Sequence, residues 1–314
     1  MPKRKFLVTA SSGADFRLDA FLSQKIKELS RSQLQKAIEQ EKVRVNQIIR
    51  RSSYKLKEGD RVEIDFEIPE PEKIAGEDLP IEVIYTDKHI LVIDKPSGMV
   101  VHPGAGNKRG TLVNALLFHF PQLKSLGPEE RSGIVHRLDK ETSGVMVVAK
   151  SLKAYQELPQ QFKKRQVKKR YLGLVWGKIP EKKGIIDWAI GRHSKRGERI
   201  SVKTKKPRSA ETHYSVQEEI GNFTLLEIRP VTGRTHQIRV HFAASGHPLA
   251  GDFRYGRRKS IPKCPRLFLH ASSLSFLHPE TKEEIEFTSP LPEDLKEFLE
   301  VLKKKENHPL KDRR

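Results

Sequence analysis

The sequence predicts an α+β fold in two domains: a small N-terminal domain, and a larger domain with a mixed, mostly antiparallel sheet. The length of 314 residues suits about two domains. Residues 68–80, rich in proline and acidic side chains, separate two segments with different patterning. Beyond them, short runs of β-forming residues outnumber helical stretches, and several are spaced like hairpin strands. This combination favours a sheet built largely of antiparallel strands.

The chain is expected to have five parts. They are an N-terminal extension (1–14), a small domain (15–67), a linker (68–80), a large domain (81–304) and a disordered basic tail (305–314). The linker is expected to be stiff and solvated, because proline restricts the backbone and acidic side chains favour water. The tail is polar and lies at a chain end, where order is least common.

In the small domain we expect two helices followed by two strands. Apolar residues recur at helical spacing in 18–22 and again in 34–38, and Ser30 is placed to cap the second helix. Residues 43–46 and 62–66 alternate between apolar and polar, as strands do, with a glycine turn before the second.

Basic residues dominate the second half of this small domain. Between Arg31 and Lys57 there are eight basic residues and two acidic ones. An excess of one sign suits the phosphates of a nucleic acid better than it suits an ordinary solvated helix face. We therefore expect an RNA-binding patch that includes Arg31 and Arg44.

The large domain is expected to contain many short strands and two helices. The helices are predicted at 112–120 and 152–164. The β-like runs are 81–85, 90–93, 134–135, 145–149, 171–176, 223–229 and 237–241.

Charge points to a polyanionic partner. The chain has 60 Lys and Arg against 40 Asp and Glu, a formal net charge of +20. Nucleic acid is the first candidate and a membrane surface the second. Because no long apolar run, signal peptide or lipidation motif appears, we expect no membrane association. The single cysteine, Cys264, fits a reducing cytoplasm. A monomer is the default expectation.

No metal or cofactor is expected. The chain has 12 histidines, but they do not form a ligand set with convincing spacing. The glycine-rich stretch 104–110 has the wrong spacing for a dinucleotide fingerprint and lacks the ending of a phosphate-binding loop.

The most informative segment runs from His136 to Gly144. It places Asp139 beside Arg137, a histidine and Lys140, between two runs of β-forming residues. A carboxylate next to cations stays ionised, which suits a nucleophile or a base. Spacing alone favours a different role, in which Asp139 shapes a loop between strands by accepting local backbone hydrogen bonds.

The small domain resembles the S4 RNA-binding domain. The matching segments are Arg17–Asp19, Leu22, Ser30–Ser32, Ile38, Val43–Asn46 and Gly59–Val62. The chain departs from that family at Glu41, where a glycine usually precedes the strand.

The large domain resembles the RluA family of pseudouridine synthases. The matching segments, in order, are Ile90–Gly98, Val101–Gly104, His136–Gly144, Lys169–Tyr171, Thr232–His241 and Gly246–Asp252. Within that family, the S4-like domain and residues 103–116 are most similar to D-type synthases of the large ribosomal subunit. C-type synthases, which also carry an S4 domain, modify other sites.

This resemblance implies a catalytic domain with a central cleft and a cofactor-free isomerisation of uridine to pseudouridine in ribosomal RNA. It implies that Asp139 either attacks the ribose C1′ or takes a proton from C2′. It also implies that Arg239, on an expected strand, pairs with Asp139, while Arg234 competes for that position. Tyr171 is expected to stack on the uracil and to remove the C5 proton.

The remaining site residues are expected to touch RNA. Arg137 resembles the family's arginine that enters the RNA stack when the target base flips out. His136 is either structural or an RNA contact. Lys169 belongs to a basic run at 163–170, and a second run at 192–208 is expected to be a flexible loop that orders on RNA.

The sequence disfavours two other functions. A catalytically inactive RNA-binding protein in ribosome assembly is disfavoured, because the expected catalytic residues are all present. A glycosidase needs two acidic residues at its site, and only Asp139 stands out.

Overall fold

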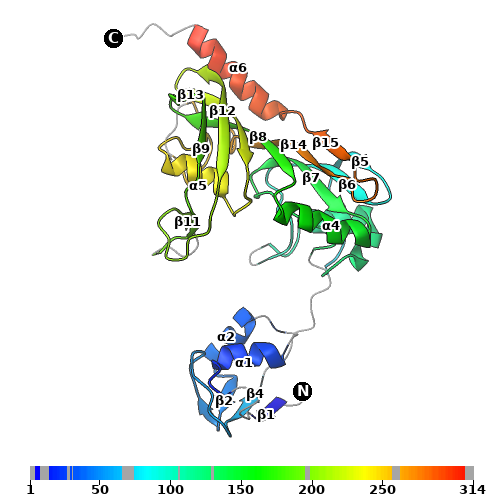
Figure 1. Cartoon of the computed structure of the whole chain (residues 1–314), viewed down its shortest axis with the longest axis vertical. Helices are drawn as coiled ribbons and strands as arrows, with labels where there is room; N and C mark the ends of the chain where they lie inside the picture. The colour runs from blue at the N-terminus through cyan, green and yellow to red at the C-terminus, as the bar shows by residue number, and fades with distance from the viewer. Residues whose placement is uncertain are drawn as a thin grey trace. The chain divides into compact units, whose positions relative to one another are not determined.

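The structure, a computed structural model, describes residues 4–7, 14–26, 29, 31–65, 74–104, 107–128, 131–194, 199–256 and 262–307. The expected helix cap Ser30, residue Phe66 and the last seven residues of the expected tail lie outside these ranges. The chain divides into two compact units, Met1–Lys73 and Ile74–Arg314, which are coloured blue and cyan to red in Figure 1.

The first unit packs two helices on a small sheet. Its elements are β1 (Arg4–Leu7), α1 (Leu18–Lys25), α2 (Arg31–Glu39), β2 (Val43–Val45), β3 (Ile48–Ile49) and β4 (Arg61–Ile64), with strand order β1-β4-β2-β3. The apolar residues that recur at helical spacing, among them Leu18, Phe21 and Leu34, form its core. Glu41 has a φ of 61°, so the turn before β2 is left-handed at the position where glycine is usual.

The second unit is built on one large sheet. Its order is β5-β6-β7-β14-β8-β13-β12-β9, with β15 pairing β14, and only β7 and β14 run parallel. The expectation of a mixed, mostly antiparallel sheet is confirmed. The strands are β5 (Glu82–Thr86), β6 (Ile90–Lys95), β7 (Ser143–Ala149), β8 (Lys168–Trp176), β9 (Lys183–Ile186), β12 (Thr212–Ile220), β13 (Phe223–Pro230), β14 (Leu269–Leu277) and β15 (Glu284–Thr288).

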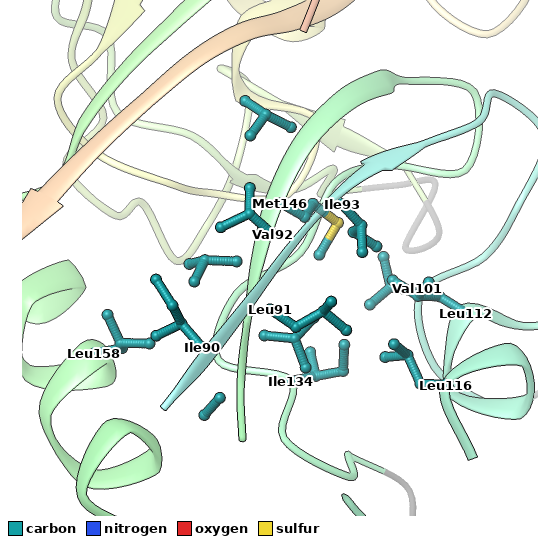
Figure 2. Close-up of a cluster of buried hydrophobic side chains, with 14 of the residues drawn as sticks. Ile90, Leu91, Val92, Ile93, Val101, Leu112, Leu116, Ile134, Met146 and Leu158 are labelled. Carbon is teal, nitrogen blue, oxygen red and sulfur yellow. The ribbon is translucent and has the colours of Figure 1, made fainter. Parts of the chain in front are cut away.

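Helices pack against the sheet through three apolar clusters. The helices are α3 (Leu112–His119), α4 (Leu152–Lys163), α5 (Gln237–Ala244) and α6 (Glu293–Asn307), with a short 3-10 helix, η1 (Pro121–Ser125), after α3. Figure 2 shows β6 surrounded by apolar side chains of α3, α4 and β7, which is why Ile90–Ile93 is a continuous apolar run. A separate cluster joins α6 to Leu174 and Phe223. A small hairpin, β10 (Gly191–Arg192) and β11 (Ile200–Ser201), lies within the basic run 192–208.

Glycine allows the parallel contact at the middle of the sheet. Gly144 opposite Ala271 and Ser143 opposite His270 are the two register pairs that join β7 to β14. Gly144 has a φ of 122°, and a Cβ there would lie 2.3 Å from the carbonyl oxygen of Ala271. The backbones therefore approach more closely than a side chain permits. This junction directly follows the loop that carries Asp139.

The structure corrects the expected strand at 237–241, which is part of helix α5. Polar and apolar residues alternate there, but every side of the helix is buried. Ile238 and Phe242, one turn apart, join the apolar cluster of β8 and β13. Gln237 and His241, also one turn apart, both contact the Thr212 hydroxyl. Since hydrogen bonds satisfy the buried polar residues, the alternation does not mark a strand.

Smaller differences concern three other segments. The expected strand 134–135 forms only an isolated bridge between Ile134 and Val148. Residues 305–307, expected in the tail, continue α6. Of the expected linker, Ile74 packs on the core of the second unit and Glu77 donates its backbone N–H to Asn114 there. In the described part of the chain, no helix is long and apolar enough to span a bilayer.

Candidate active site

A cleft of about 520 Å³ in the second unit collects residues from four parts of the chain. The loop before β7 contributes 135–139 and Thr142, and the end of α4 with the start of β8 contributes residues between Phe162 and Tyr171. The segment from the end of β13 into α5, 230–239, forms the opposite wall, and Leu269 of β14 completes the lining.

Asp139 lies in a loop that β6 and its following turn hold in place. Lys95, fully buried, donates from Nζ to the carbonyl oxygens of Pro96, Met99 and Lys140 at 2.7, 2.9 and 3.3 Å. Gly98 donates its backbone N–H to the same Lys140 oxygen at 2.8 Å. The carbonyl oxygen of the residue directly after Asp139 is therefore held by two donors, and the Asp139 carboxylate itself remains 15% exposed.

Arg239 of α5 lies beside Asp139 but is anchored elsewhere. Its Nε and Nη2 donate to the two carboxylate oxygens of Asp252 at 2.8 and 2.9 Å. Its Nη1 lies 3.3 Å from Glu141 and 3.8 Å from Asp139 Oδ2. Burial opposes charge on both partners, but their mutual hydrogen bonds raise the pKa of Arg239 and lower that of Asp252. A permanent cation thus faces the Asp139 carboxylate.

His236 approaches Asp139 on its other oxygen. Nε2 of His236 lies 3.9 Å from Asp139 Oδ1, and Nδ1 lies 2.8 Å from the hydroxyl of Tyr255. Burial lowers the pKa of His236 below its usual value, although Asp139 acts in the opposite direction. The imidazole is therefore neutral at pH 7.

Tyr171 and Lys169 enter the cleft from β8. Burial, and then the charge of Asp139, raise the pKa of the Tyr171 phenol, so it is neutral at physiological pH. Lys169 donates to the carbonyl of Thr232 at 3.4 Å, and burial lowers its pKa to about 8. An apolar ring and a cation thus stand together on one wall.

His136 and Arg137, which precede Asp139 in the same loop, have different surroundings. His136 stacks on Phe162 with ring centroids 4.6 Å apart, and its Nε2 accepts the backbone N–H of Val147 at 3.0 Å. Burial lowers its pKa to about 3, so it holds the loop against β7 as a neutral acceptor. Arg137 is exposed at the cleft. Arg234, also exposed, donates from Nε to the Ser209 carbonyl at 3.2 Å.

Comparison with known proteins decides the family. The sequence model of the RNA pseudouridylate synthase family matches residues 89–244. The chain is 43% identical over 298 residues to the ribosomal large subunit pseudouridine synthase D of Nitrosomonas europaea, covering 92% of this chain and 85% of that protein. The chain belongs to the RNA pseudouridine synthases.

Other matches agree with this assignment. The synthase is 42% identical to the uncharacterized RNA pseudouridine synthase YlyB of Bacillus subtilis, covering 92% of this chain and 94% of that one. The solved structure of human RNA pseudouridylate synthase domain containing 1 has a TM-score of 0.57 and 31% identity, covering 69% of the synthase and 86% of that chain. Residues 16–62 match the S4 domain, which confirms the expected N-terminal fold.

The site contains residues that sequence reasoning missed. Asp252 and His236 lie within segments that match the family, but the sequence assigns no role to either of them or to Tyr255. Their significance depends on contacts with Arg239 and Asp139, and nothing in the spacing of the chain signals those contacts. Among the described residues, no group of three His, Cys, Asp or Glu side chains could hold a metal ion.

The expected RNA contacts Arg31 and Arg44 belong to the S4 unit of the synthase. Arg31 donates to the fully buried carboxylate of Asp19 at 3.0 Å, together with Arg17 and Gln35. These donors lower the pKa of Asp19 to about 2, despite the opposing effect of burial. Arg44, on β2, is exposed.

Proposed function

We propose that the synthase converts particular uridines of large-subunit (23S) ribosomal RNA to pseudouridine, with Asp139 as the reacting carboxylate. The observation that carries this proposal is the position of Asp139 in the cleft, with Arg239 and His236 on its two oxygens and Tyr171 nearby. Three relatives named ribosomal large subunit pseudouridine synthase D, at 41–43% identity, support the substrate class.

Each cleft residue then has a chemical task. Asp139 acts on the ribose of a flipped-out uridine, at C1′ as a nucleophile or at C2′ as a base, and Arg239 favours its ionised form. Tyr171 offers an apolar ring on which the uracil stacks. Because its phenol is neutral, removing the C5 proton would require a base that accepts the phenol proton in turn.

Binding residues surround this centre. We propose that Arg137 takes the place of the flipped base, and that Lys169 and Arg234 contact phosphates. The S4 unit, through Arg31 and Arg44, holds a neighbouring part of the RNA and raises the local concentration of substrate. No cofactor is required, because the reaction is an isomerisation without redox change. We further propose that the enzyme acts in the cytoplasm as a monomer, since one chain supplies every residue named here.

Tritium release from C5-labelled uridine in 23S rRNA transcripts tests the catalytic proposal. We expect the wild type to release tritium and Asp139→Ala to release none while still binding the transcript. Glu300→Gln, which removes an exposed carboxylate on α6, serves as the control and should keep full activity. Full activity in Asp139→Ala would overturn the role of Asp139. Binding without tritium release by the wild type would favour an assembly factor.

Mapping pseudouridine in ribosomal RNA from a deletion strain tests the substrate class. We expect uridines of the large subunit to lose the modification, and the lost positions distinguish D-type from C-type targets. Unchanged large-subunit RNA would contradict the proposal.

A further inference from the structure

His236 is held in an unusual conformation beside the reacting carboxylate. It is the N-cap residue of α5 and has φ 54° and ψ 22°, in the left-handed region. Residues other than glycine rarely adopt this conformation, and it persists only where surrounding contacts enforce it. At His236 those contacts are Tyr255 on Nδ1 and Asp139 facing Nε2.

Tyr255 contacts the ring nitrogen of His236 that points away from Asp139. Its hydroxyl accepts the backbone N–H of Ile200 at 3.3 Å and lies 2.8 Å from His236 Nδ1. A phenol has one hydrogen to donate, and a neutral imidazole has one acceptor nitrogen. The Asp139 carboxylate faces Nε2 and favours the imidazole hydrogen on that nitrogen, which leaves Nδ1 to accept the hydroxyl hydrogen.

Further contacts fix Tyr255. Its backbone N–H and that of Arg254 both donate to Asp252 Oδ1 at 3.0 Å, so the carboxylate that anchors Arg239 also shapes this turn. The guanidinium groups of Arg239 and Arg199 lie 5.3 and 5.4 Å from the centre of the Tyr255 ring. Arg199 and Ile200 belong to the basic run 192–208, so Tyr255 connects the β10–β11 hairpin to His236.

We propose that His236, held as the Nε2–H tautomer by Tyr255, donates a hydrogen bond to Asp139 Oδ1 during the reaction. With Arg239 on Oδ2, this donor fixes the orientation of the carboxylate toward the ribose. The present separation of 3.9 Å exceeds a hydrogen bond, and such contacts in substrate-free sites shorten when the substrate binds. Tyr255 is a positioning residue that acts through His236. The inference rests on the proposed role of Asp139.

Two substitutions of His236 separate a specific donor from a structural residue. In His236→Gln the amide reaches about as far as Nε2 and can donate to Asp139, whereas in His236→Asn it reaches only as far as Nδ1. We expect the single-turnover rate at saturating RNA to fall on the order of 100-fold in His236→Asn, and less than about tenfold in His236→Gln. RNA affinity should stay unchanged in both. Since asparagine tolerates the left-handed conformation better than glutamine, a purely structural role would give the opposite order.

Tyr255→Phe tests the positioning role, because it removes the hydroxyl and keeps the ring between the two guanidinium groups. We expect about a tenfold lower rate with unchanged RNA affinity. Equal rates for His236→Asn, His236→Gln and wild type would overturn the inference, as would losses confined to RNA affinity. If the wild type is active and Asp139→Ala is inactive, either of these results refutes the role of His236 and leaves the proposed function intact.

The tautomer can also be observed directly, without any variant. Nitrogen-15 chemical shifts of the His236 ring in labelled full-length protein distinguish Nδ1–H from Nε2–H. We expect Nε2–H near pH 7, and observation of Nδ1–H would overturn the inference.

Discussion

At the scale of single residues, the site is organised by one arginine shared among three carboxylates. Asp252 holds Arg239 through two hydrogen bonds, so its direction does not depend on Asp139. If Asp139 reacts as proposed, it can change its charge or form a bond without releasing the guanidinium. Removing one partner from such a buried pair leaves an uncompensated charge, which costs about 3–5 kcal/mol. Asp252 is thus as important for holding the site as the residues that face substrate.

We expect Lys169 to make RNA binding sensitive to pH. Its pKa of about 8 means that it is charged at pH 7 and mostly neutral at pH 9. We expect affinity for the transcript to weaken on the order of tenfold over this interval, because a charged contact to phosphate is lost. Filter binding with the inactive Asp139→Ala variant measures this without turnover.

Adding Lys169→Arg to that variant provides the control. Arginine stays protonated across the whole interval, so its affinity should change much less between pH 7 and pH 9. An identical pH dependence in the lysine and arginine proteins would show that another group is responsible.

At the scale of elements, the parallel contact between β7 and β14 determines where the loop that carries Asp139 ends. We expect Gly144→Ala to destabilise the protein by several kcal/mol, since its Cβ would overlap backbone atoms of Ala271 that cannot move aside. The loop carrying Asp139 should shift with β7, so activity should fall as well. Urea unfolding and tritium release measure the two effects.

Gly221→Ala is the matched control for this junction. Gly221 also has a positive φ, 56°, but a Cβ there meets nothing within 4 Å. Gly221→Ala should therefore lower the free energy of unfolding by only about 1 kcal/mol, the cost of placing a side chain at a positive φ. Equal losses of unfolding free energy in Gly144→Ala and Gly221→Ala would show that the close approach of the β7 and β14 backbones is not important.

Helix α5 shows why it was harder to predict whether a segment is a helix or a strand than to predict a mostly antiparallel sheet. The apolar runs of β6 and β7 are buried on both faces and are unmistakable in the sequence. In α5, buried polar residues bond to a neighbouring strand, so its polarity pattern reflects partners that lie far away in the chain. The apolar residues Ile238 and Phe242 are four positions apart, as on one face of a helix, but this one pair does not distinguish a helix from a strand.

At the scale of the whole molecule, we expect charge and domain organisation to affect RNA affinity more than the chemical step. Each unit has its own apolar core, so residues 74–314 should fold without the S4 unit. We expect this fragment to keep its single-turnover rate at saturating RNA but to bind the transcript more weakly. Its affinity should also depend less steeply on salt, because fewer cations meet phosphates.

Binding measured across a series of salt concentrations tests this expectation. The full-length Arg44→Ala variant, which removes one exposed cation of the S4 unit, should reduce the salt slope by about one. An unchanged slope in the fragment would mean that the S4 unit does not touch the RNA. A loss of rate at saturation would mean that it contributes to the active site.

The sequence by itself determined the two folds, the sheet type, the excess of positive charge and the loop in which Asp139 lies. These follow from local patterns: apolar runs, alternation, turn residues and ordered segments of a known family. Only the tertiary structure decided that Arg239 reaches the site from a helix, that Asp252 anchors it, and that His236 and Tyr255 complete the surroundings of Asp139. Arg239 and Asp139 are 100 positions apart, and contacts at such separations depend on how the sheet and α5 pack, a property that no local spacing encodes.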